Sequence, residues 1–138
     1  MGLFSKLFGN AGAGKPSRTG VFPSPEFSSA GAAIAAMISR QREHWPGGWV
    51  SVTLVDHKGD DDPPMIQVGG EQEPEINTLL RRAPELFVAS LGLVERKEGL
   101  YLVPDADVAQ VAQVVEALLA ELFHAAPGDR LQIDIDPG

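Results

Sequence analysis

A glycine-rich segment near the amino terminus comes closest to a known motif for chemistry. Gly9–Lys15 match the first seven positions of the Walker loop, in which backbone amides and a lysine hold phosphate. The next position needs a Ser or Thr to bind magnesium, but it is Pro16, and Ser17 follows one residue late. Because proline also removes a backbone donor and no helical pattern follows, we interpret the segment as a linker and predict no nucleotide cofactor.

A second group of chemically capable residues surrounds His57, which lies close to Asp56 and to the acidic run Asp60–Asp62. Carboxylate oxygens of this kind suit hard cations such as Ca²⁺. No glycine and distal glutamate stand in the register of a calcium-binding loop, and the chain has no cysteine for a zinc–thiolate site. We therefore expect a solvated acidic loop and predict no metal.

Candidate catalytic side chains are few and scattered. His44 and His124 each fall at the end of a predicted helix, where an imidazolium interacts favourably with the helix dipole. The sequence contains no Gly-x-Ser-x-Gly nucleophile elbow. An enzyme would have to assemble its site from separate groups such as Asp56, His57 and Asp134, so we keep this as an alternative and predict that the protein is not an enzyme.

Charge is distributed unevenly along the 138 residues, whose net charge is −8. Residues 1–48 carry five basic and two acidic side chains, a net +3, whereas residues 49–138 carry six basic and seventeen acidic ones, a net −11. Such an acidic domain repels nucleic-acid phosphates and anionic membranes and attracts basic partners. We therefore expect a protein partner with a basic or apolar surface, and the acidity disfavours nucleic acid.

Residues 1–27 are rich in glycine, proline and serine, which predicts a flexible, disordered arm. The first eight residues differ, because their apolar side chains recur at helical spacing. This strip is our first candidate partner-binding element and the one expected membrane contact; it consists of Leu3, Phe4, Leu7 and Phe8. It is too short for a secretory signal, and no apolar run approaches the roughly 18 residues of a membrane span, so we expect a cytoplasmic protein.

The first elements of the domain are predicted to be a helix and a hairpin. Ser28 and Ser29 are good N-caps, and the apolar spacing that follows predicts a helix to His44. β-Branched residues predict strands over residues 49–56 and 65–68, joined by a long loop. The aromatic residues that flank the intervening turn are expected to anchor the core; they are Trp45 and Trp49.

The middle of the domain is predicted to be helical, because Pro74 suits a first helical turn and apolar residues follow at helical spacing. The predicted buried stripe consists of Ile76, Leu79, Leu80 and Ala83. Pro84 breaks or kinks this helix, and Gly92 closes a short second one. Residues 93–103 give the clearest hairpin, with Gly99 at the left-handed position of its loop.

The strongest helical pattern follows Pro104, with Asp105 as the expected N-cap. Its apolar stripe is our second candidate partner-binding surface, through which two chains would form a dimer; it consists of Val111, Val115, Leu118 and Leu122. Alternation of apolar and polar residues over positions 131–136 predicts a final strand with one polar face.

These elements predict an α+β fold in the order α-β-β-α-β-β-α-β, with an antiparallel sheet of about five strands and two to four helices packed on it, in one acidic domain of residues 28–138. The order resembles that of small acidic secretion-chaperone domains, in which helices flank a twisted antiparallel sheet; no residue motif carries this resemblance. With the acidity and the lack of a catalytic site, it favours a non-enzymatic protein-binding or chaperone-like adaptor. Seven arginines against four lysines, with abundant alanine and glycine, are typical of a GC-rich bacterial genome.

A winged-helix DNA-binding regulator is the second alternative. Residues 76–91 and the hairpin of residues 93–103 would form its recognition helix and wing, and Leu91–Lys97 is similar to the phrase that precedes such wings. The phosphate contacts would come from Arg81, Arg82, Arg96 and Lys97. The net charge of −11 in residues 49–138 and the lack of a preceding helix pair oppose this interpretation.

Overall fold

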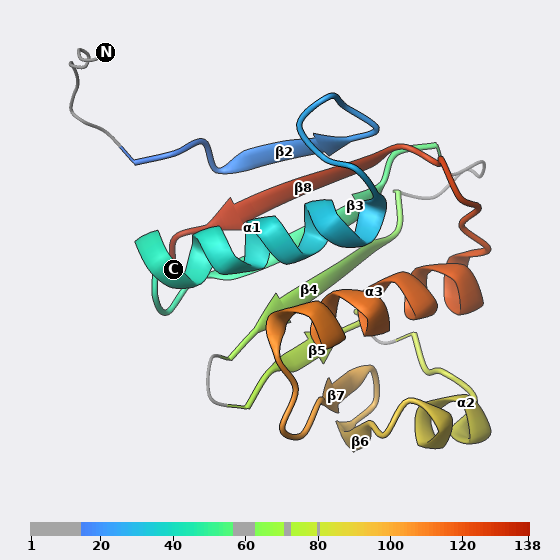
Figure 1. Cartoon of the computed structure of the whole chain (residues 1–138). Helices are drawn as coiled ribbons and strands as arrows, with labels where there is room; N and C mark the ends of the chain where they lie inside the picture. Colours follow the sequence, from blue (N-terminus) through green and yellow to red (C-terminus); the bar gives the residue numbers. More distant parts are fainter. Residues whose placement is uncertain (1–14, 57–62, 71–72, 80) are drawn as a thin grey trace, which may run out of the picture.

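The computed structural model describes residues 15–56, 63–70, 73–79 and 81–138. Within these residues seven strands form one antiparallel sheet, in the order β2-β8-β3-β4-β5-β7-β6, and three helices accompany it. Helices α1 and α3 lie side by side across one face of this sheet (Figure 1), and α2 lies beside β6 at one end of it. The α+β class and the antiparallel sheet are therefore confirmed, and the sheet has seven strands where about five were expected.

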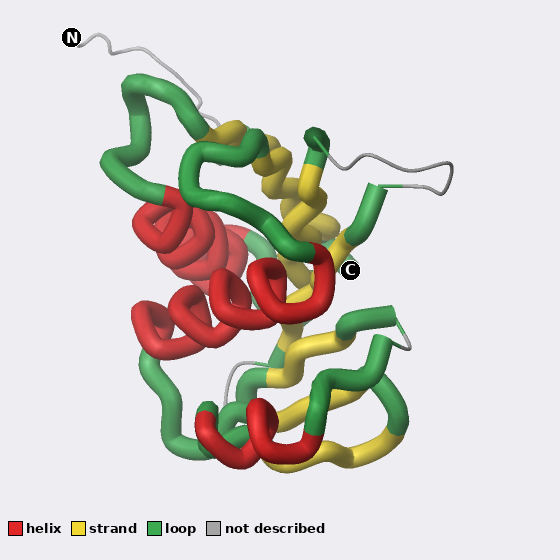
Figure 2. Tube along the Cα trace, turned by 90° about the vertical axis from the view of Figure 1, so that its right-hand side faces the viewer, coloured by secondary structure: helices red, strands yellow, loops and turns green. Residues whose placement is uncertain are grey.

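The elements of the described residues follow in chain order. They are β2 (Thr19–Phe22), α1 (Ala30–His44), β3 (Trp49–Leu54), β4 (Met65–Gly69), β5 (Glu75–Asn77), α2 (Glu85–Ser90), β6 (Val94–Lys97), β7 (Leu100–Leu102), α3 (Val108–Phe123) and β8 (Leu131–Asp136). Figure 2 shows the same arrangement from the side, with the helix layer against one face of the sheet.

Helix α1 begins where the sequence predicts. The Ser29 hydroxyl accepts a hydrogen bond from the Ala32 amide at 3.0 Å, and this cap satisfies one of the free amides of the first turn. The helix ends at Trp45, whose amide donates to Gln41 O at 2.8 Å. One side of α1 is buried against the sheet and α3, and its buried residues are Ala33, Ile34, Met37, Ile38 and Gln41.

The central strands alternate as predicted. In β3, Val50 and Val52 are fully buried, whereas Ser51 and Thr53 on the opposite face are half-buried. The predicted hairpin of β3 and β4 is present, with Val52 opposite Ile66. The final strand β8 pairs with the edge of β3 that faces away from β4. It presents Leu131, Ile133 and Ile135 to the core. The period of two therefore assigns the apolar set of each strand to the helix-covered face.

The predicted helix over residues 74–83 is wrong. Residues 75–77 form strand β5, which pairs with β4 and β7 and places a fully buried Ile76 between Val68 and Tyr101. Leu79, expected in the buried stripe, has a positive φ of 55° and is 47% exposed. The four apolar residues of this stretch have helical spacing, but pairing with strands on both sides overrides this short local pattern and gives a strand.

The second short helix and the hairpin after it are present. α2 follows Pro84, Gly92 adopts a φ of 70° at its end, and Gly99 adopts a φ of 78° in the turn between β6 and β7. Tyr101 on β7 is fully buried, and its hydroxyl accepts a hydrogen bond from the Ala83 amide at 2.9 Å. This bond fixes the segment before α2 against the sheet.

Helix α3 begins two residues later than expected. Asp107, not Asp105, is the N-cap: its carboxylate accepts from the Gln110 amide, and the Gln110 side chain accepts from the Asp107 amide. Asp105 instead has a φ of 52° in the loop before the helix. The reciprocal bonds form a capping box, which explains why the later aspartate is preferred.

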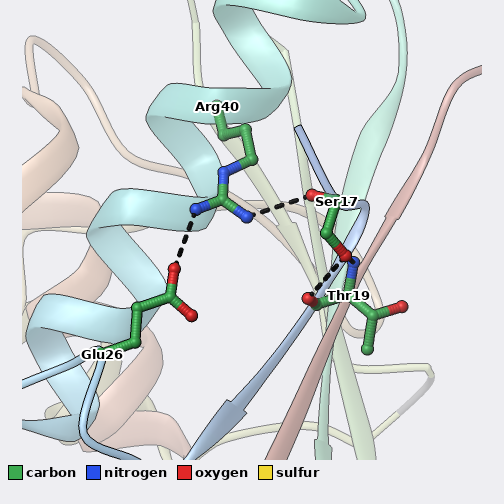
Figure 3. A network of polar contacts seen from close by, with 4 residues as sticks. All are labelled: Ser17, Thr19, Glu26 and Arg40. Atoms are coloured by element: carbon green, nitrogen blue, oxygen red, sulfur yellow. Dashed lines mark hydrogen bonds and ion pairs between the residues drawn. The ribbon is translucent and has the colours of Figure 1, made fainter. Parts of the chain in front are cut away.

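Part of the expected arm is ordered in the sheet, so the expectation of a disordered arm is wrong for residues 19–22. These residues form edge strand β2, which pairs with β8. Arg40 of α1 holds the strand in place (Figure 3): it donates to Ser17 O at 3.0 Å and to a carboxylate oxygen of Glu26 at 3.2 Å. The sequence gives no apolar pattern for this strand, because its core-facing position 20 is a glycine. Gly20 lies beneath Met37, where a Cβ would be only 3.0 Å from the sulfur.

Candidate functional site

The apolar stripe of α3 lies inside the protein. Its four candidate partner-binding residues are between 0 and 8% exposed, and they pack in the common core with α1 and the sheet; they are Val111, Val115, Leu118 and Leu122. Such a stripe cannot reach a second chain unless the helix layer opens. The expectation that it is a dimer surface is corrected accordingly, because α1 and the sheet cover it.

Several of the other sequence candidates fall outside the described residues. These are Leu3, Phe4, Leu7, Phe8, the near-Walker segment Gly9–Gly14, His57 and the acidic run Asp60–Asp62. Lys15, the last residue of the near-Walker match, is described: its ammonium donates to His44 O at 2.9 Å and lies 5.4 Å from the centre of the Trp45 ring. Its charge is therefore directed to the end of α1.

The structure places the two described catalytic candidates, Asp56 and Asp134, apart. The Asp56 carboxylate accepts from the Arg130 guanidinium at 2.7 and 2.8 Å and from the Arg130 amide at 3.0 Å. Asp56 raises the pKa of Arg130 above its usual value, first through its hydrogen bond to the guanidinium and second through its negative charge. Asp134 lies elsewhere, opposite Ser51 in the sheet. Among the described residues no group of three or more His, Asp or Glu side chains is placed to hold a metal ion.

The recognition helix of a winged-helix domain is not formed, because residues 75–77 are a strand and α2 has only six residues. Two of the four candidate phosphate contacts are also engaged within the protein. Arg82 forms a two-pronged pair with Glu95 at 2.9 and 3.0 Å, and this bond raises the pKa of Arg82. Arg81 donates to Leu122 O at 3.2 Å and lies over the Phe123 ring at 5.1 Å.

The face of the sheet opposite α1 and α3, which we call the open face, has no covering helix layer in the described residues. No described helix packs on it (Figure 2), and its strands present mixed polar and apolar side chains there. Its apolar members are Val21, Trp49, Met65, Leu100, Leu102 and Val94. Val21 is 50% exposed, Val94 48% and Trp49 37%. This apolar set is spread over five of the seven strands, and large uncovered apolar patches mark binding surfaces.

The expectation that both tryptophans anchor the core holds for one of them. Trp45 is half-buried and packs against the core, whereas Trp49 stands on the open face. Trp49 begins β3, and the register of the β3–β4 pair continues to Gly69 opposite it. Alternation in the sequence Trp-Val-Ser-Val-Thr-Leu already places Trp49 on the same face as Ser51 and Thr53, a signal that could have identified its exposure.

The open face is acidic. It carries the carboxylates of Glu75, Asp134 and Asp136, and none of the three has an ion-pair partner in the described ranges. Asp134 accepts hydrogen bonds from the Thr19 hydroxyl at 2.9 Å and from the side-chain Nε2 of Gln132 at 3.1 Å, so these two partners are neutral. A cation approaching this face therefore meets negative charge that the protein itself does not compensate.

Both edges of the sheet are protected against pairing with a further strand. At the β2 edge the Ser17 hydroxyl accepts from the Thr19 amide and donates to the Thr19 carbonyl, both at 3.1 Å (Figure 3). These are the outward backbone groups of a four-residue strand, which ends at Phe22 and is followed by Pro23. At the opposite edge β6 contains a bulge between Glu95 and Lys97. A short strand, a capped edge and a bulge all oppose the addition of a further strand.

The helix layer carries a depression of about 280 Å³ between α1 and α3, one of about 330 Å³ beside the start of α3, and a small apolar pocket of about 180 Å³ at the end of the α1–α3 junction. The carboxylates of the small pocket already have positions within the protein: Asp129 accepts from the Ala126 amide at 2.7 Å, and Glu116 lies over Gly31, where a Cβ would overlap its carboxylate. No helix of the described residues is long and apolar enough to cross a membrane. No protein-family model, curated protein or solved structure matches the chain. Within the described residues, the open face is thus the best candidate for a functional site.

Proposed function

We propose that this protein is a non-enzymatic adaptor that binds a basic, partly apolar segment of another protein on the open face of its sheet. The observation that carries this proposal is the composition of that face: exposed or half-buried apolar side chains on five strands, together with three carboxylates that have no ion-pair partner among the described residues. A buried core needs no such carboxylates, and a purely solvated surface needs no such apolar set.

Charge complementarity identifies the class of partner. Glu75, Asp134 and Asp136 give the central strands a negative face, and the basic side chain Lys97 lies on β6 at its far end. A segment with Arg or Lys would meet these carboxylates while its apolar residues cover Trp49 and the leucines of β7. The contacts require neither a nucleophile nor a metal, in keeping with an adaptor.

The test uses two synthetic peptides of equal length and equal leucine content, one rich in arginine and the other with glutamate at every arginine position. We expect the arginine peptide to bind with micromolar affinity in calorimetry at low salt, and the glutamate peptide not to bind. Backbone amide shifts in NMR spectra should map to β3, β4, β5, β7 and β8 and leave the outer surface of α1 and α3 unchanged.

A charge-neutral variant supplies the matched comparison. Replacing both aspartates of β8, Asp134→Asn with Asp136→Asn, should weaken binding of the arginine peptide about tenfold, because two attractive charges are lost. The control, Glu43→Gln with Glu121→Gln, removes the same charge from exposed positions on the helices and should leave the affinity unchanged. Equal binding of both peptides, or shifts centred on the helix layer, would overturn the proposal.

A further inference from the structure

The open face contains a notch bounded by residues from three neighbouring strands. Trp49 on β3, Gly69 on β4 and Glu75 on β5 lie in one row across the sheet: Gly69 pairs with Glu75, and a Cβ on Gly69 would lie 3.7 Å from the Trp49 Cβ. Strands two positions apart are separated by about 9–10 Å. Because Gly69 has no side chain, a gap remains between the indole on one side and the carboxylate on the other.

The surroundings make this gap a depression of about 260 Å³. Its lining includes Trp49, Gly69 and Glu75, and it continues along the next row of the sheet to Gln67 and Leu100. The nearest atom to a Cβ on Gly69 is at an ordinary contact distance, so the space above this glycine is unfilled. Gly69 also has no unusual φ, so backbone conformation does not explain the glycine.

We propose that this notch holds an arginine side chain of the partner segment, a proposal that rests on the open face being the binding surface. The guanidinium would insert above Gly69, stack on the Trp49 indole and pair with the Glu75 carboxylate. It would act as the anchor of the segment, with the apolar contacts on β7 beside it.

The chemistry of the walls selects this ligand. An indole face attracts a cation, and a planar guanidinium can stack on the ring while its edge donates two hydrogen bonds to a carboxylate. A further donor of the guanidinium can reach Gln67, whose amide nitrogen contacts Met65 Sδ at 4.0 Å and leaves the carbonyl oxygen to accept. An apolar side chain would leave Glu75 without a cation, and a carboxylate would be repelled by it.

The comparison with the other carboxylate–arginine pairs supports the assignment. Glu95, Asp56 and Glu26 each bind an arginine of this chain, at 2.9, 2.7 and 3.2 Å respectively. Glu75 has a glycine notch and an indole beside it but no basic partner in the described residues. The notch thus has an aromatic wall, an acidic wall and an open floor at Gly69, the three features that a bound guanidinium would contact.

The direct test titrates N-acetyl-arginine methylamide into the full chain labelled with ¹⁵N. Its neutral isostere, N-acetyl-citrulline methylamide, is the matched ligand control. We expect the arginine derivative to shift the Gly69 amide and the Trp49 indole N–H, and the citrulline derivative to leave both unchanged. Equal shifts from the two ligands, or shifts at neither position, would overturn the notch.

Two variants make the test specific to the notch. Gly69→Val fills the gap with a residue that suits a strand, and Glu75→Gln removes the charge without changing the size of the side chain. Each should reduce the shift at the Trp49 indole and weaken the arginine peptide about five- to tenfold, the scale of an exposed stacking or ion-pair contact. Glu121→Gln on α3 is the charge-matched control, and circular dichroism confirms that each variant is folded.

The results separate the notch from the adaptor function. Binding of the arginine peptide to the open face that is insensitive to Gly69→Val and Glu75→Gln would refute the notch and leave the adaptor function intact. Specific shifts by the arginine derivative without any binding of the peptide would support the notch and count against the wider surface. Loss of both would refute both proposals.

Discussion

The two faces of the sheet are built from the same strands but meet different surroundings. On the covered face Val50, Val52 and Ile76 are completely buried beneath α1 and α3. On the open face their immediate neighbours in sequence, such as Trp49 and Ser51, are half-buried or exposed, and the carboxylates there have no ion-pair partner in the part of the chain that the structure describes. The difference shows that the helix layer buries one face of the sheet, where the packing contributes to stability, and leaves the other face without a helix cover among the described residues.

The strongest way to break this comparison is to place a charge on each face in turn. Val52→Glu buries a carboxylate among Ile66 and Ile133, and we expect a loss of more than about 4 kcal/mol, enough to prevent folding. Thr53→Glu puts the same charge on the open face and should change stability by less than about 1 kcal/mol. Urea unfolding followed by circular dichroism measures both; similar losses would show that the open face is covered.

Truncation of aliphatic side chains gives the next largest effect. Ile76→Ala should destabilise the protein by about 2–4 kcal/mol, because it leaves a cavity between Val68 and Tyr101. Leu102→Ala, on the neighbouring strand but on the open face, should cost about 1 kcal/mol or less and weaken the arginine peptide. A small loss for Ile76→Ala would contradict the assignment of β5 to the core of the sheet.

The Arg40 contacts that join α1 to the β2 edge are expected to make an intermediate contribution to stability. Arg40→Met removes the bonds to Ser17 O and Glu26 and should destabilise the fold by about 1–2 kcal/mol. Hydrogen exchange should increase at the amides of β2 and stay unchanged in β4 and β5. The comparison variant Glu26→Gln keeps the bond from Arg40 to Ser17 O and should destabilise the fold by less than half as much. Hydrogen exchange that becomes uniformly faster across the whole sheet would argue against a local role of Arg40 at β2.

The smallest effect is expected at the sheet edge where the two faces meet. Ser17→Ala removes two solvent-exposed hydrogen bonds to Thr19 and should lower stability by about 0.5 kcal/mol. Exchange of the Thr19 amide should become faster, because its outward N–H loses its cap. An unchanged exchange rate at Thr19, with the neighbouring Val21 as an internal reference, would mean that the serine does not protect this edge.

Prediction from the sequence succeeds where a local pattern has one physical interpretation. The cap at Ser29, the hairpin of β3 and β4 and the final strand β8 all follow from neighbouring residues. It fails where a short pattern fits two structures, as at Ile76, whose spacing to Ala83 suits a helix although its neighbours are strands. It also fails at α3, where a strong apolar stripe signals burial as readily as a partner surface, and the packed α1 decides between them.

By itself, the sequence determined the α+β class, the antiparallel hairpins and the apolar face of strands such as β3 and β8, because these depend on periodicity and on caps within a few residues. Only the tertiary structure decided which strands are neighbours. The pairing of Thr19 with Asp134 joins residues far apart in the chain, and the row of Trp49, Gly69 and Glu75 exists only because β3, β4 and β5 adopt one register. Hydrogen-bonded register depends on contacts across the whole sheet, so the notch has no signature in any local stretch of sequence.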